Sequence, residues 1–171
     1  MNQAFLDRSK IGLSPGGITE MFEGYPNPPC THVDDEAALI KSRKGFIRMA
    51  IQHQTPIIPV YCFGATKLFQ RLNLPLLQKI SRILKISICI FYGRLGLPIP
   101  FRQRLLYVMG NPIYPPDIAH SNYNAGNNIS SDQVFRQNVD EMHEKFCDEL
   151  LRIFDKYKES YGWGDKILHL T

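Results

Sequence analysis

A glycine pair and a nearby carboxylate are the first residues in the chain whose types could support chemistry. The segment SPGGITE places Gly16 and Gly17 directly after a proline, and Glu20 three residues further on. Glycine has no side chain and tolerates positive φ, so such a pair can bring backbone N–H groups close to a bound ligand. Neither glycine pattern of nucleotide-binding loops, G-x-x-x-x-G-K-[ST] or G-x-G-x-x-G, is present. Taken alone, the segment therefore favours a turn between a strand and a loop.

Basic side chains form the second candidate group, because they share one long stretch with a single sign of charge. The chain carries a net charge of +4, but residues 37–116 hold twelve Lys and Arg and no Asp or Glu. From Asp117 onward there are ten acidic and six basic residues. Such a stretch favours an anionic partner, either phosphates, nucleic acid or cytoplasmic-leaflet headgroups, and a basic surface without a specific ligand is the alternative. No nucleic-acid recognition motif accompanies the charge, so we expect no nucleic-acid partner.

Length and composition limit the remaining classes. With 171 residues and 44% hydrophobic content, the chain predicts a single domain over residues 1–171. Its four cysteines form no C-x-x-C pair, which argues against a disulfide framework or a zinc site and favours reduced thiols. Neither a secretory signal nor a window of about twenty apolar residues is visible, so we expect no membrane span in this chain. The chain can still lie on a membrane surface.

Hydrophobic periodicity predicts the elements that would position these residues. A helix is expected over residues 35–53, beginning at Asp34 and Asp35, because acidic side chains in a first turn suit the helix dipole. The run TPIIPVYCFG is β-branched and aromatic, which predicts a buried strand. A basic amphipathic helix is expected over residues 74–85, either facing the core or lying in a membrane interface.

The second half of the chain predicts two more strands and a long helix. The strands lie in ISICIFYG and RLLYVMGNPI and end at Gly93 and Gly110. Apolar residues at every third or fourth position predict the helix, which starts near Ser131. The order of elements predicts an α/β layer fold with a central sheet flanked by helices, a long C-terminal helix, and a first strand that enters near Lys10.

Four ordered segments and the C-terminal tail give the chain a family likeness. SPGGITE is followed by RKGFIRMAIQHQTPIIPVYCFG, then by FYGR and MGNPI, and the tail reads LLRIFDKYKESYGW. From about Ser9 to its last residues, the chain resembles the C-terminal half of the diacylglycerol acyltransferase type 2 family, which includes monoacylglycerol acyltransferases and wax synthases. SPGGITE and TPIIPVY are also distantly similar to the third and fourth sequence blocks of glycerol-phosphate acyltransferases. The likeness implies a partial glycerol-phosphate-acyltransferase-like layer fold.

The family resemblance implies a reaction and its setting. A fatty acyl group would pass from acyl-CoA to a lipid hydroxyl, with conversion of diacylglycerol to triacylglycerol as the expected case. The partners would be acyl-CoA and a neutral lipid acceptor, at the cytosolic face of the endoplasmic reticulum membrane or at a lipid droplet. Acyl-CoA would be a substrate, and the resemblance implies neither a metal nor a cofactor.

The resemblance also implies roles for individual residues. Gly16 and Gly17 would shape the backbone close to the thioester, and Glu20 would orient a histidine or the acceptor hydroxyl in a supporting catalytic role. Arg43 and Lys44, in RKGF, would bind coenzyme A phosphates or acidic headgroups, where Arg chelates and Lys acts as a point charge. A solvated helix face is the alternative for these two residues.

The chain departs from the family pattern in three places. Arg94 of FYGR would add positive charge at the substrate, but the extra Leu95 separates it from Gly96, which weakens that assignment. Ala65 stands where an acidic residue often follows the family's F-G. The H-P-H-G motif, whose histidine is the family's general base, does not occur in the 171 residues.

The histidines that are present do not replace the missing motif. His143 and Asp148 match the broader acyltransferase pattern H-x-x-x-x-D, but they fall in a predicted helix, where five residues rotate the chain by about 500° and leave the two side chains about 140° apart. We therefore expect His143 to be structural or solvated. His53 is expected at a helix C-terminus, and His32 in a capping or loop role.

These observations lead to two competing hypotheses. In the first, the chain is the C-terminal portion of an acyltransferase domain, the histidine motif and membrane spans lie upstream, and the fragment alone is inactive. In the second, it is a non-catalytic basic module that binds lipid or a membrane surface. Vesicle binding without acyl transfer, once the upstream segment is supplied, would favour the second.

Overall fold

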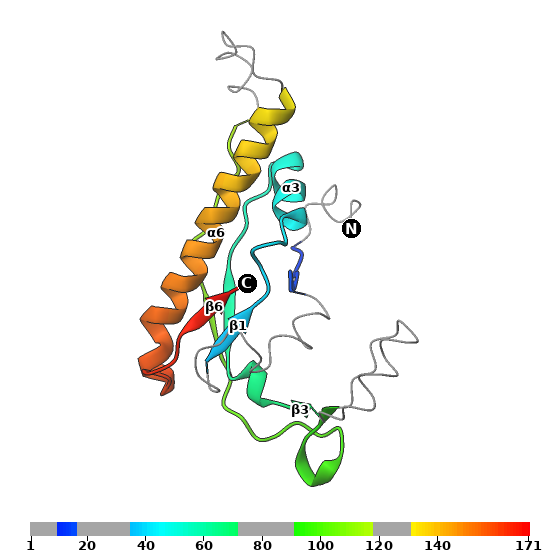
Figure 1. Cartoon of the computed structure of the whole chain (residues 1–171), viewed down its shortest axis with the longest axis vertical. Coiled ribbons are helices and arrows are strands. Elements are labelled where there is room, and N and C mark those ends of the chain that lie inside the picture. The colour runs from blue at the N-terminus through cyan, green and yellow to red at the C-terminus, as the bar shows by residue number, and fades with distance from the viewer. Residues whose placement is uncertain (1–9, 17–34, 72–90, 118–130) are drawn as a thin grey trace. The chain divides into compact units, whose positions relative to one another are not determined.

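The computed structural model describes residues 10–16, 35–71, 91–117 and 131–171 (Figure 1). The chain divides into two compact units. The first combines Met1–Tyr61 with Val108–Thr171, and the second is Cys62–Tyr107. The expectation of one domain over residues 1–171 stays a prediction.

The long C-terminal helix expected from about Ser131 is confirmed as α6, Ser131–Tyr161. Its buried face is the apolar stripe that the sequence predicts: Val139, Met142, Phe146, Leu150 and Ile153. Helix α3, Gly45–Gln52, packs beside α6 (Figure 1). It buries Ile47, Ala50 and Ile51. These two helices therefore share an apolar contact within the first unit.

The first half of the helix expected over residues 35–53 is wrong, because Glu36–Ala38 form strand β1. β1 runs parallel to β6, Leu168–Leu170, with Glu36 opposite Leu168 in the register. The Glu36 N–H donates to the Ile167 carbonyl at 3.0 Å, and the Thr171 N–H donates to the Ala38 carbonyl at 2.9 Å. Pairing with a distant strand overrides local helix propensity here, and only the second half of the range is helical.

Strands are found in both TPIIPVYCFG and RLLYVMGNPI, but the first is not the buried strand expected, because only Phe63 of its four residues is buried. They are β2, Val60–Phe63, and β5, Leu106–Met109, and they pair with each other. Beside them, the Gly110 N–H donates to the Pro59 carbonyl at 2.8 Å. Residues Ile57 and Ile113 continue the association as an isolated antiparallel bridge.

Within the second unit, the described residues include a short strand pair and two one-turn 3-10 helices. β3, Gln70–Arg71, is antiparallel to β4, Phe91–Tyr92, which is the described end of the strand expected in ISICIFYG. Helix η1, Ala65–Lys67, precedes β3, and η2, Arg94–Gly96, follows β4. The amphipathic helix expected over residues 74–85 lies outside the described residues.

These elements make the chain a mixed α/β protein, as predicted. The described strands pair two by two into three sheets, and the single central sheet of a glycerol-phosphate-acyltransferase-like fold stays a prediction. The strand expected near Lys10 is not found in residues 10–16, where Pro15 and Gly16 make a turn. None of the described helices has the length and apolar character required to cross a bilayer.

Candidate functional site

The glycine turn of the predicted site is described only at its start. Gly16 is buried and lies in the turn after Ser14. Gly17 and Glu20 lie outside the described residues, so their expected roles stay predictions. The described candidates are the basic residues Arg43, Lys44 and Arg94, together with the segments RKGF, TPIIPVY and MGNPI.

Arg43 and Lys44 stand together immediately before α3, with Lys44 as the N-cap residue. The Lys44 ammonium lies 2.8 Å from the Asp140 carboxylate of α6, and both side chains are more than a third exposed. The hydrogen bond from Lys44 holds the pKa of Asp140 below its usual range. The Arg43 side chain is exposed, and its backbone N–H donates to Ile40 at 2.8 Å. Lys44 therefore joins two helices, and Arg43 stands beside it with an exposed side chain.

Arg94 belongs to the second unit, where it begins η2 and exposes its side chain. The inserted residue, Leu95, has a φ of +58° and is 93% exposed. The extra residue is therefore accommodated by a left-handed turn and not by packing. The structure brings Arg43 and Lys44 together and places Arg94 in the other unit.

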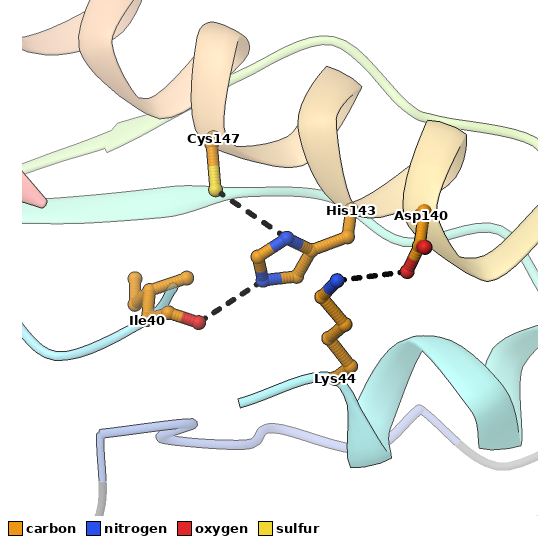
Figure 2. A network of polar contacts seen from close by, with 5 residues as sticks. All are labelled: Ile40, Lys44, Asp140, His143 and Cys147. Carbon is orange, nitrogen blue, oxygen red and sulfur yellow. Dashed lines mark hydrogen bonds and ion pairs between the residues drawn. The ribbon is translucent and has the colours of Figure 1, made fainter. Parts of the chain in front are cut away.

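His143 lies in a buried polar network that Figure 2 shows from close by. Its Nε2 is 3.0 Å from the Ile40 carbonyl oxygen, and its Nδ1 is 3.9 Å from the Cys147 sulfur. A carbonyl can only accept, so Nε2 carries the proton and the Nδ1 lone pair faces the thiol. Burial raises the pKa of the Cys147 thiol, which keeps it protonated as a donor.

The surroundings of His143 and Asp148 can be compared with the acyltransferase pattern H-x-x-x-x-D. Both ring nitrogens of His143 face groups of the chain itself, and Asp148 is exposed to solvent. The arrangement agrees with the structural role expected for His143. His53 is the C-cap residue of α3, where the sequence predicts it, and His32 lies outside the described residues.

Aromatic contacts dock two of the family-like segments onto α6. Phe46, the last residue of RKGF, meets Phe146 edge to face, with ring centroids 5.0 Å apart. Tyr61, the last residue of TPIIPVY, meets Phe154 in the same way at 5.3 Å. Such pairs contribute about 0.5–1.5 kcal/mol beyond the apolar area that they bury. The spacing of Phe146 and Phe154 along α6 thus fixes where the two segments lie.

The MGNPI segment is held against the same helix by a carboxylate. Glu149 accepts the Asn111 N–H at 2.5 Å and two hydrogen bonds from the Arg152 guanidinium at 2.6 and 2.7 Å. The Arg152 hydrogen bonds are the main reason that the pKa of Glu149 is lowered to about 2. A Cβ on Gly110 would lie 2.6 Å from the Ile153 Cδ1, so any larger residue would force that side chain to shift.

A second group of polar residues joins β1 to β6, and the sequence did not indicate it. Asp35, expected in the first turn of a helix, instead accepts from His169 Nε2 at 2.9 Å and from the Ile167 N–H at 3.1 Å. Glu36 pairs with Lys166 at 3.3 Å, and both side chains are largely buried. The alternation Leu168–His169–Leu170 was the available signal, but three residues are too few for a strand prediction.

Chemically, the described residues of the first unit form a scaffold that carries an exposed cation, Arg43, next to the Lys44–Asp140 ion pair. The segments RKGF, TPIIPVY and MGNPI all contact α6, within the first unit. In the described part of the chain, no three His, Cys, Asp or Glu side chains gather into a possible metal site. The expectation that no metal takes part stays a prediction.

Known proteins with a similar sequence belong to one enzyme family. Residues 6–170 match the family model described as diacylglycerol acyltransferase. The chain is 27% identical to acyl-CoA wax alcohol acyltransferase 1 from Homo sapiens, over 91% of this chain and 45% of that protein. It is 31% identical to acyl-CoA wax alcohol acyltransferase 2 from Homo sapiens, over 86% of this chain and 42% of that protein.

A third relative carries a different substrate in its name. The chain is 24% identical to diacylglycerol O-acyltransferase 2 from Homo sapiens, over 86% of this chain and 36% of that protein. In all three comparisons the chain spans less than half the length of the relative. No solved structure matches the chain.

Proposed function

Because the chain belongs to the diacylglycerol acyltransferase family, we propose that it is part of an O-acyltransferase of neutral lipid synthesis. The proposed reaction transfers a fatty acyl group from acyl-CoA to a lipid hydroxyl, with diacylglycerol as acceptor and triacylglycerol as product. The observation that carries the proposal is the family match over residues 6–170. Further support comes from the packing of three family-like segments on one helix, α6.

The proposed step needs a base that the described residues do not supply. The acceptor oxygen forms a bond to the acyl carbonyl carbon, and the bond from that carbon to the coenzyme A sulfur breaks. The hydroxyl proton passes to a general base, and the thiolate leaves and takes up a proton. We assign the base to an H-P-H-G histidine outside the 171 residues, so this chain alone would be inactive. His143 is a poor substitute because both of its ring nitrogens face internal partners.

The remaining assignments follow the same proposal. Gly16 and Gly17 would shape the backbone near the thioester, and Glu20 would orient the base or the acceptor hydroxyl. Arg43 would bind a coenzyme A phosphate, since its guanidinium is exposed and always charged. Lys44 would contribute positive charge near the same phosphate, and its ammonium would stay paired with Asp140.

We also propose the setting of the reaction. The protein would work at the cytosolic face of the endoplasmic reticulum membrane or at a lipid droplet, where its neutral lipid acceptor is found. It would need no metal and no cofactor, with acyl-CoA acting only as substrate. The stretch of twelve basic and no acidic residues over 37–116 suits both an anionic acyl donor and an anionic membrane.

A chimera tests the proposed transfer. The part of acyl-CoA wax alcohol acyltransferase 1 that precedes its aligned region would be joined to this chain and expressed in microsomes without their own neutral-lipid acyltransferases. With labelled acyl-CoA, the chimera should acylate diacylglycerol, and the 171-residue chain alone should not. Monoacylglycerol and a fatty alcohol, supplied in parallel, would identify a different acceptor.

Substitutions in the chimera test the role of Arg43. Arg43→Gln should raise the KM for acyl-CoA about tenfold, the effect of losing one charge-assisted hydrogen bond, with a smaller change in kcat. Arg48→Gln is the matched control, because Arg48 is an exposed cation on α3. Equal effects of the two substitutions on the KM for acyl-CoA would show that Arg43 does not bind acyl-CoA specifically.

Two results would overturn the proposed function. One is acyl transfer by the 171-residue chain alone that is abolished by His143→Ala. The other is a folded, membrane-inserted chimera that acylates none of the three acceptors. Vesicle binding by the chimera without any acyl transfer would favour the alternative, a non-catalytic lipid- or membrane-surface-binding module.

A further inference from the structure

Three exposed aliphatic side chains lie on one loop of the second unit. Leu95 is 93% exposed, Leu97 50% and Ile99 47%. We call residues 93–99 the η2 loop, and Figure 1 draws it in green. A single exposed apolar side chain is ordinary, but three at alternate positions of a short loop indicate an interaction surface.

The backbone holds the η2 loop in this conformation. The Gly93 N–H donates to the Leu97 carbonyl at 2.8 Å, and the Arg94 N–H donates to the Ile99 carbonyl at 2.9 Å. A Cβ on Gly93 would collide with the Ile99 carbonyl, so the loop closes only around glycine. Leu95 has a φ of +58°, which a bulky side chain rarely adopts. Among the described residues, the most exposed leucine therefore stands in a strained position, and such strain is typical of functional segments.

Cationic and aromatic side chains accompany the η2 loop. Arg94 lies within it, Arg102 and Arg104 follow it, and all three are exposed. Tyr107 is 66% exposed and presents an amphipathic ring of the kind found at membrane interfaces. The second unit, Cys62–Tyr107, contains no Asp or Glu. A negatively charged partner would therefore meet no acidic side chain in this unit.

The combination of aliphatic and cationic groups selects one kind of partner. A nucleic acid would offer phosphates to the arginines but would leave the aliphatic side chains exposed to water. A folded protein would need about 800 Å² of surface on each side, more than three side chains provide. A bilayer with anionic lipids satisfies both, because aliphatic side chains enter the acyl boundary and guanidinium groups bind lipid phosphates.

We propose that the η2 loop inserts Leu95, Leu97 and Ile99 into the headgroup and upper acyl region of an anionic membrane, with Arg94 and Arg102 on lipid phosphates. This contact deepens the membrane location proposed above, and it rests on that location. Its test measures binding and insertion depth, so it can fail or succeed independently of acyl transfer.

Vesicle flotation tests the apolar part of the contact. The 171-residue chain should bind phosphatidylcholine vesicles that contain phosphatidylserine. Serine substitutions at all three positions, Leu95, Leu97 and Ile99, should weaken this binding about tenfold or more. Ile58→Ser is the matched control, because Ile58 is an apolar residue of the first unit that is 51% exposed. It should leave binding unchanged.

The cationic part is tested separately. Arg94→Gln combined with Arg102→Gln should weaken binding to phosphatidylserine-containing vesicles roughly tenfold or more, and should reduce its salt dependence. Weak binding to vesicles of phosphatidylcholine alone should change little. Binding of the double variant that equals wild type at low salt would overturn the proposed phosphate contacts.

A fluorescence experiment measures insertion directly. Trp163 is the single tryptophan of the sequence, so Leu95→Trp adds one distinguishable signal. Lipids brominated on their acyl chains should quench the added emission and leave that of Trp163 unchanged. Gln133→Trp, at an exposed position of α6, is the control that should not be quenched. Leu95→Trp keeps the loop apolar, so it tests insertion even if the triple serine variant does not fold.

Three outcomes would overturn the proposal. The first is undiminished vesicle binding by a folded triple serine variant, with folding verified by circular dichroism. The second is an unquenched Leu95→Trp signal from vesicle-bound protein. The third is a dimer that the serine substitutions abolish without any change in vesicle binding, which would make a second copy of the chain the partner of the loop.

Discussion

The imidazole Nε2 of His169 lies 2.9 Å from the buried carboxylate of Asp35, although 134 residues separate the two in the sequence. The same carboxylate accepts the Ile167 N–H, and Lys166 reaches Glu36 beside it. Lys166 also lies over the Trp163 ring, 4.4 Å from its centroid. Side chains therefore reinforce the backbone pairing of β1 with β6.

Asp35→Ala should lower the free energy of unfolding by about 2–4 kcal/mol, because it removes the acceptor of a part-buried N–H and of a histidine. Urea denaturation followed by circular dichroism would measure the change. Asp140→Ala provides the comparison, since Asp140 belongs to an exposed ion pair whose loss should cost much less. Equal losses in the two variants would show that the Asp35 carboxylate does not stabilise the strand pair.

Glu149→Gln should destabilise the chain at neutral pH and lose this effect in acid. The folded-state pKa of Glu149 is lowered from 4.5 to about 2, mainly by Arg152 and further by the Asn111 N–H. A lowered pKa stabilises the folded state fully above pH 4.5, and this contribution is lost as the pH falls through about 2. The Arg152 side chain is 46% exposed, so solvent screening should limit the effect to about 1–2 kcal/mol.

Urea unfolding between about pH 2 and pH 7 tests this pH dependence. The stabilities of wild type and Glu149→Gln should converge as the pH falls towards 2. Asp155→Asn serves as the control, because the Asp155 side chain is 65% exposed in its pair with Lys158. A constant difference between wild type and Glu149→Gln across the whole range would contradict the assigned pKa.

Gly110→Ala should destabilise the chain by about 1–3 kcal/mol, because the new Cβ would lie 2.6 Å from the Ile153 Cδ1 and 2.7 Å from a Glu149 oxygen. Ile153→Val removes the Cδ1 atom, so the double variant should be more stable than the sum of the two single changes predicts. Gly45→Ala is the control, since a Cβ there meets nothing within 4 Å. Strict additivity would show that MGNPI does not press on α6 as described.

His143→Gln in the chimera should leave kcat within about twofold of the unsubstituted chimera, because a structural histidine does not take part in proton transfer. His143→Leu should lower the free energy of unfolding by about 1 kcal/mol, since it removes one of the two hydrogen bonds that the Ile40 carbonyl accepts and keeps the other, from the Arg43 N–H. Kinetics measured well below the unfolding temperature separate the two effects. A large loss of kcat in folded His143→Gln would contradict the structural role.

The sequence alone predicted the elements whose signals are local. α6 carries apolar residues at every third or fourth position, and β2 and β5 lie in short β-branched and aromatic runs bounded by glycine or proline. β1 had no such signal, since Glu36–Ala38 are poor strand formers that become a strand only against Leu168–Leu170. Without a strand signal in this segment, the acidic residues Asp34 and Asp35 were interpreted as the first turn of a helix.

For the candidate site, residue types and motif order could be predicted, but contacts could not. The family assignment rested on segments that the sequence displays directly. The pairing of Lys44 with Asp140 depends on the mutual rotation of α3 and α6, which packing sets and sequence spacing does not reveal. The exposure of Leu95 depends on a left-handed backbone conformation that its neighbours impose.

The parallel pair of β1 and β6 also constrains how the chain acquires its structure during synthesis. A ribosome adds about 5–20 residues per second. With 134 residues between Asp35 and His169, residue 35 is made roughly 7 to 27 s before its partner exists. Throughout that interval β1 lacks the strand it pairs with, so this part of the first unit can form only after residues 168–170 have been made.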